Sequence, residues 1–140
     1  MESGWDGLVA SPALCEKLLP LSTTVSKPLG TVLFLRGDVC DGAFLICCGK
    51  VRLSLDAGDS LFPPRILGPG CIVGLPSALS GLVYSLNAEV VEDAMLACVS
   101  KEALCCCLRQ NPELCMEVMQ LLSREISTTR AVLKNGAIEA

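Results

Sequence analysis

The ten cysteines of this 140-residue chain could take part in more kinds of chemistry than its other residues. Thiolates bind zinc and iron–sulfur clusters, attack electrophiles and exchange disulfides. Their spacing matches none of these roles, because no CxxC pair occurs and only Cys15 precedes Cys40. On a helix, the consecutive cysteines 105–107 would point about 100° apart and could not converge on one metal ion. We therefore predict reduced cysteines in a cytoplasmic protein, most of them packed as small apolar side chains, with no metal and no cofactor; a thiol-based sensor is an alternative.

Groups that could act in acid–base or nucleophilic catalysis are missing or dispersed. The chain has no histidine, which excludes Ser-His and Cys-His pairs and histidine metal sites. Asp56 and Asp59 fall in a predicted hairpin turn, and Glu89, Glu92 and Asp93 flank another turn. Carboxylates at turns are ordinarily solvated surface groups. We expect no enzymatic activity.

The net charge and the hydropathy of the chain limit which kinds of partner we expect it to bind. Eleven basic and 15 acidic residues give a net charge of −4, so this chain alone is expected not to bind nucleic acid. Ile66 to Ala88 is a run of 23 residues without a charge, long enough on paper for a membrane span. Six glycines and prolines interrupt this run, which predicts buried loops and short strands and no membrane segment.

The elements that must position any site begin with a helix and continue with strands. Ser11-Pro12 is an N-cap followed by proline at the first helical position, and it predicts a helix over residues 11–19. Residues 25–100 alternate β-forming runs with glycine, proline and aspartate turns, which predicts about eight short strands and one helical turn at Pro76 to Ser80. The longer predicted strands are Thr31 to Leu35, Ala43 to Cys48 ending at Gly49-Lys50, Val51 to Leu55, Asn87 to Val91 and Met95 to Val99.

Helical periodicity returns in residues 101–135. Lys101 to Arg109 predicts a short helix after Ser100, and Asn111-Pro112 starts a second helix that ends at Asn135-Gly136. A helix of about 23 residues is ~35 Å long, which a domain of this size rarely covers by itself. We predict that its apolar stripe forms a homodimer, the alternative being packing on its own sheet. The stripe comprises Leu114, Val118, Leu121, Leu122, Ile126, Thr129 and Leu133.

The fold class that follows is α+β. We expect one domain over residues 1–140: an antiparallel β-roll of the jelly-roll type, flanked by short helices, with a long C-terminal dimerisation helix. Five segments carry a family resemblance: Val32 to Asp38, Ala43 to Leu53, Leu67 to Gly74, Val91 to Leu96 and Asn111 to Leu114. Their order resembles the cyclic-nucleotide-binding effector domain of the CRP/FNR superfamily. The resemblance covers nearly the whole chain and implies a sensor or regulatory domain.

In that family, a phosphate-binding cassette holds the cyclic nucleotide. A glycine and a glutamate open the cassette, a helical turn follows, and an arginine, a serine or threonine and an alanine close it. The resemblance implies that the glutamate binds the ribose 2′-hydroxyl, that the arginine neutralises the cyclic phosphate and that the helix N-terminus adds N–H donors. Here Gly74 keeps the glycine, but Leu75 replaces the glutamate and Tyr84 replaces the arginine. Because no basic residue lies between Arg65 and Lys101, no shift of the alignment restores the site.

The binding site that the resemblance assigns is therefore mostly apolar: Ile72, Val73, Gly74, Leu75, Pro76, Ser77, Tyr84, Ser85 and Leu86. Losing the phosphate counterion and the ribose acceptor should weaken binding at least ~10³-fold, so weak or no binding of cAMP and cGMP is predicted. Three alternatives remain open. The pocket takes a small neutral or apolar ligand; the pocket is filled, and the domain dimerises or docks a protein partner; or Arg65 and backbone amides bind a cyclic nucleotide in another way. In the filled case, Tyr84 is expected to pack over the site with its hydroxyl in water.

Overall fold

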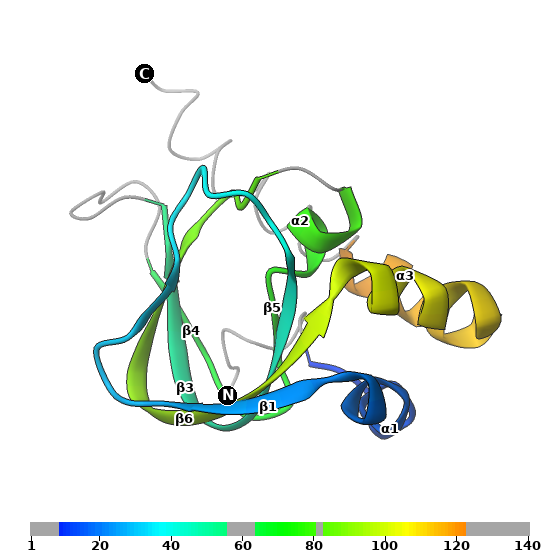
Figure 1. Ribbon diagram of the computed structural model, residues 1–140, viewed down its shortest axis with the longest axis horizontal. Helices are drawn as coiled ribbons and strands as arrows, with labels where there is room; N and C mark the ends of the chain where they lie inside the picture. Colours follow the sequence, from blue (N-terminus) through cyan, green and yellow to red (C-terminus); the bar gives the residue numbers. More distant parts are fainter. Residues whose placement is uncertain (1–8, 56–63, 81–82, 123–140) are drawn as a thin grey trace.

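Two long antiparallel strands, β3 (Gly42–Ser54) and β6 (Asn87–Ser100), form the frame of a β-roll (Figure 1). The computed structural model describes residues 9–55, 64–80 and 83–122. Two shorter strands pair with β6 and two with β3, all antiparallel. They are β1 (Thr23–Lys27) and β2 (Val32–Phe34) on β6, and β4 (Arg65–Leu67) and β5 (Ile72–Val73) on β3.

Short helices lie at the end of the roll and on its rim (Figure 1). They are α1 (Pro12–Leu18), the 3-10 helix η2 (Leu19–Leu21), α2 (Leu75–Ser80) and α3 (Lys101–Gln110). Helices α1 and α3 stand together where β6 leaves the roll, and α2 follows β5. No helix within the described ranges is both long enough and apolar enough to cross a bilayer.

Strands β3 and β6 are continuous where the sequence predicted breaks. The expected strand end at Gly49-Lys50 and the expected gap before Met95 are wrong, and the described residues form six strands. The register between β3 and β6 shifts three times within residues 46–51, so β-bulges bend the strands without ending them. Gly49 permits the bend, because its φ is +91° and a Cβ there would overlap the backbone of Ala94.

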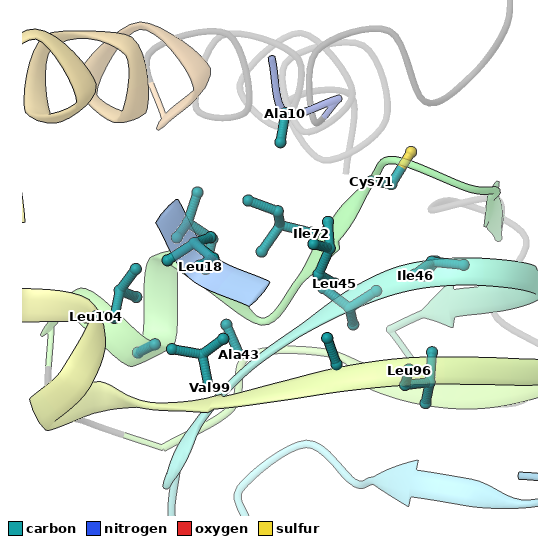
Figure 2. Close-up of a cluster of buried hydrophobic side chains, with 14 of the residues drawn as sticks. Ala10, Leu18, Ala43, Leu45, Ile46, Cys71, Ile72, Leu96, Val99 and Leu104 are labelled. Carbon is teal, nitrogen blue, oxygen red and sulfur yellow. The ribbon is translucent and has the colours of Figure 1, made fainter. Parts of the chain in front are cut away.

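One apolar core joins the helices to the sheet (Figure 2). Leu18 of α1, Ile72 of β5 and Leu104 of α3 are each at most 2% exposed. They meet Leu45 of β3 and Val99 of β6 in the same cluster. Burial of each such side chain contributes about 1.5–3 kcal/mol. Since β5 is anchored in this core, the start of α2, where the expected cassette lies, is held in a defined place.

Serine hydroxyls cap helices α1 and α3; the cap at Ser11 was predicted from the sequence and is confirmed, whereas the cap at Ser100 was not predicted. The Ser11 hydroxyl accepts the N–H of Leu14 at 3.2 Å, and the Ser100 hydroxyl accepts the N–H of Ala103 at 3.1 Å. Such a cap contributes about 1 kcal/mol. The backbone N–H and hydroxyl of Ser11 also donate to the carboxylate of Glu117, at 2.8 and 2.6 Å. These bonds join the start of α1 to the chain beyond α3.

Helical backbone resumes after Asn111 and covers residues 112–122. Its inward side chains pack on the domain's own core: Leu114, Val118, Leu121 and Leu122. The first part of the predicted dimer stripe is thus used within the domain. The remaining stripe residues lie outside the described residues: Ile126, Thr129 and Leu133.

Candidate functional site

The segment that resembles the start of the cassette connects β5 to α2. Gly74 has a φ of +83°, which favours glycine, and its carbonyl accepts the N–H of Ala78 at 3.0 Å. Val73 and Leu75, on either side of Gly74, are completely buried in the apolar core. The residue at the glutamate position therefore serves the core and does not line the remaining cavity.

Tyr84, at the position expected for the arginine, is locked in place. Its side chain is 5% exposed, and its hydroxyl donates to the carbonyl of Gly42 at 2.8 Å. Its backbone N–H donates to the carbonyl of Asp38 at 2.9 Å, and its own carbonyl accepts the N–H of Gly37 at 2.8 Å. The expectation that this hydroxyl lies in water is wrong. Burial raises the pKa of the Tyr84 hydroxyl above its ordinary range, and the neighbouring Cys40 adds to the shift.

Phe34 is the partner of Tyr84 that sequence reasoning missed. The two rings stack face to face, with centroids 3.6 Å apart and planes 6° apart. Phe44 extends the cluster, its ring 5.9 Å from that of Phe34. Phe34 ends the short strand β2, where an apolar residue is ordinary core, so its local sequence carries no signal for this role. The available signal in the sequence was the rarity of aromatic residues, since the chain has three phenylalanines and one tyrosine.

Little space remains at the cassette. The cavity beside Tyr84 has a volume of about 30 Å³, room for no more than a water molecule or two. Pockets that hold a small organic ligand usually measure roughly 300–1,000 Å³. The structure brings seven of the predicted site residues together around this cavity, joined by Phe34 and Leu53: Ile72, Gly74, Pro76, Ser77, Tyr84, Ser85 and Leu86.

No charged side chain of the described residues lines this cavity. Arg65, considered as a replacement for the missing arginine, lies half-buried on β4 with its backbone opposite Leu53 of β3. Arg52 forms an ion pair with Glu89 across β3 and β6. The polar groups beside the cavity are therefore hydroxyls and backbone amides, which cannot neutralise a phosphate.

The cysteines are distributed between core and surface. Seven of the ten are buried or half-buried, and the exposed ones are Cys47, Cys48 and Cys106. Burial raises the pKa of the Cys98 thiol. Burial, followed by the charge of Glu117, raises the pKa of the Cys15 thiol. A raised pKa lowers the thiolate fraction at neutral pH, which makes these two thiols poor nucleophiles.

With the roll and the cassette position in place, the chain can be compared with known proteins. Residues 24–111 match the model of the family described as Cyclic nucleotide-binding domain. The chain belongs to this family. The matched residues run from β1 to the end of α3 and include the whole cassette position.

Two matches come from Thermus thermophilus. Its Cyclic AMP receptor protein is 31% identical over 100 residues, which are 71% of this chain and 46% of that protein. The crystal structure of its Catabolite Activator Protein superposes with a TM-score of 0.74 at 27% identity, covering 89% of this chain and 59% of that one. This similarity confirms the predicted CRP-type β-roll with flanking short helices.

A transcriptional regulator of Thermotoga maritima shares the fold, with a TM-score of 0.70 at 18% identity over 84% of this chain and 93% of that one. These similar proteins are named as a receptor, an activator and a regulator, not as enzymes. The chain spans about half the length of the receptor protein that it matches.

Proposed function

We propose that this chain is a regulatory domain of the CRP type that does not bind cAMP or cGMP in the usual way. The observation that carries the proposal is the Phe34–Tyr84 stack, which leaves about 30 Å³ at the cassette. The domain retains the family's fold, but its own side chains occupy the place of the ligand.

The Phe34–Tyr84 stack adds a steric cost to nucleotide binding, beyond the absence of the family's glutamate and arginine. A nucleotide can enter only if Tyr84 leaves, which breaks its bond to Gly42 and its stacking on Phe34. The hydrogen bond and the stack each contribute about 0.5–1.5 kcal/mol. Together they correspond to a further weakening of roughly 5- to 150-fold. A small neutral or apolar ligand would face the same steric cost.

The test is isothermal titration of the reduced 140-residue chain with cAMP and with cGMP. The cyclic AMP receptor protein of Thermus thermophilus is the positive control, measured with cAMP. We expect no saturable heat below about 1 mM nucleotide. Binding tighter than ~100 μM would overturn the proposal. Measuring Arg65→Ala next would then show whether that arginine supplies the phosphate contact.

We further propose that the helix beginning at residue 112 pairs with a second copy of the chain. Met116 and Met119 are each 57% exposed on this helix, beside inward residues that pack on the core. Large apolar side chains repeated on one exposed helix face favour contact with another apolar surface. Light scattering should give twice the chain mass for the wild type and a lower mass for Met116→Glu/Met119→Glu. A monomeric mass for the wild type would refute this pairing.

A further inference from the structure

A second hollow lies against the same two rings that fill the cassette. Its volume is about 620 Å³, and both Phe34 and Tyr84 line it as well as the 30 Å³ cavity. The two rings therefore lie between a small cavity and a larger, more open hollow. The hollow is bounded by η2, the starts of β1 and β3, the β2–β3 connection and the end of β6. Figure 1 shows β1 and the end of β6 side by side where they meet the helices.

Part of the lining of this hollow is apolar. Leu33 and Phe44 lie among its lining residues. Leu21 and Val39 also line it, and they are 48% and 75% exposed. Single exposed apolar residues are common on protein surfaces, but these two border a hollow that is itself partly apolar. Such an arrangement is typical of a surface that another molecule covers.

The surface continues beyond the hollow itself. Val39 forms an isolated β-bridge with Val83, which is 47% exposed. Leu19, in the same short helix as Leu21, is 43% exposed. A small molecule seated in the hollow would leave these side chains in water. A peptide segment could cover the hollow and its border together, so the exposed border favours a protein partner.

The charge of the hollow is of one sign. Asp38 and Asp41 line it, and no lysine or arginine of the described residues does. The Asp38 carboxylate accepts the N–H of Leu35 at 3.0 Å, but a carboxylate has about four acceptor positions. The Asp38 carboxylate can therefore accept further hydrogen bonds from a cationic group of a partner. Both carboxylates are exposed, so a lysine or arginine can reach them from solvent.

We propose that this surface, the Asp38/Asp41 groove, docks a short segment of a partner protein that carries apolar side chains together with lysine or arginine. The apolar side chains enter the hollow over Leu33 and Phe44. The basic group pairs with the carboxylates of Asp38 and Asp41 at the rim. This inference does not depend on whether the cassette binds a nucleotide, because the named docking contacts lie outside the cassette cavity.

The test uses fluorescence anisotropy with a fluorescein-labelled nonapeptide of alternating leucine and arginine. A matched nonapeptide carries glutamate in place of arginine. We expect the basic peptide to bind the wild type saturably below 1 mM and the acidic peptide not to bind. The double variant Asp38→Asn/Asp41→Asn should weaken binding of the basic peptide at least fivefold. Asparagine at position 38 keeps an acceptor for Leu35, so the turn is retained.

Two further variants separate docking from non-specific attraction and from misfolding. Glu92→Gln removes one negative charge from the exposed part of β6, outside the groove, and should leave the affinity unchanged. Val39→Ser alters a side chain that is 75% exposed, so the fold should survive, yet binding should weaken at least threefold. Absence of saturable binding to the wild type would overturn the proposal. Equal binding of the two peptides, or equal weakening by Glu92→Gln and the double aspartate variant, would also overturn it.

Discussion

The filled cassette and the Asp38/Asp41 groove share Phe34 and Tyr84, yet one holds about 30 Å³ and the other about 620 Å³. On the cassette side, the rings meet the turn at Gly74 and the apolar side chains that follow it. On the groove side, Asp38 and Asp41 stay at the surface, since carboxylates are costly to bury without a partner. Two spaces that share the same pair of rings can therefore differ widely in volume, because different side chains complete each one.

The fold does not rest on polar contacts at the cassette position. The roll is held by the long β3–β6 pairing and by a core that includes Leu75. Neither depends on a bound nucleotide. The cassette position can change its chemistry as long as the replacing side chains pack as well as the ones that they replace.

Tyr84→Ala should have the largest effect, because it removes the ring that lies between the cassette cavity and the Asp38/Asp41 groove. It deletes the stack on Phe34 and the bond to Gly42 and leaves a cavity, so the free energy of unfolding should fall by about 3–5 kcal/mol. Urea denaturation followed by circular dichroism measures this. Affinity for cAMP should stay weak, because the opened space still lacks an arginine. A loss below about 1 kcal/mol would mean that the stack does not hold the cassette closed.

Gly74→Ala should have the second largest effect, because it alters only the cassette side of the Tyr84 ring. A Cβ at Gly74 would lie 3.0 Å from Cε1 of Tyr84, and φ there is +83°. Since the Tyr84 ring is held by its stack on Phe34 and by its bond to Gly42, it yields little, and we expect a loss of about 2–3 kcal/mol.

Gly30→Ala is the matched control for this substitution. Gly30 has a φ of +96°, but a Cβ there would have no neighbour within 4 Å, so only backbone strain remains. Its loss should be about 1 kcal/mol. If denaturation shows equal losses for the two glycines, the contact with Tyr84 has no energetic weight.

Tyr84→Phe keeps the aromatic ring and removes only the hydrogen bond from the hydroxyl to the carbonyl of Gly42. The stack on Phe34 should survive, but the carbonyl of Gly42 loses its 2.8 Å donor. We expect a loss of about 1–2 kcal/mol in unfolding free energy at neutral pH. Nucleotide affinity and groove binding should not change. A stability equal to that of the wild type would show that the hydroxyl bond is dispensable.

The smallest effect is confined to alkaline pH. The pKa of Tyr84 is raised in the folded state above its ordinary value of 10.0, because burial disfavours the phenolate. The folded protein then holds this proton more tightly than the unfolded chain, so stability is fully present below pH 10 and falls as pH rises further. Between pH 9 and 11, wild-type stability should fall more steeply than that of Tyr84→Phe. Parallel curves for the two proteins in denaturation at each pH would contradict the raised pKa.

Local signals in the sequence predicted much of the fold. Ser11 caps its helix as expected, and the helix expected after Ser100 is present, since a helix start depends mostly on the next few residues. The strand ends were less predictable. Gly49 indicated a break, but the long partner strand β6 carries the pairing through a bulge, and a single segment does not reveal its partner's length.

By itself, the sequence determined the order of elements, the absence of histidine chemistry, and the residue types Leu75 and Tyr84 at the positions where the family resemblance predicts a glutamate and an arginine. Those properties depend on residue type and on neighbours close in the chain. Only the tertiary structure decided what Tyr84 does, because its hydroxyl donates to a carbonyl 42 positions away and its ring stacks on Phe34 of strand β2. Whether a hollow closes or stays open depends on which side chains converge from distant segments, and packing of that kind has no local signal.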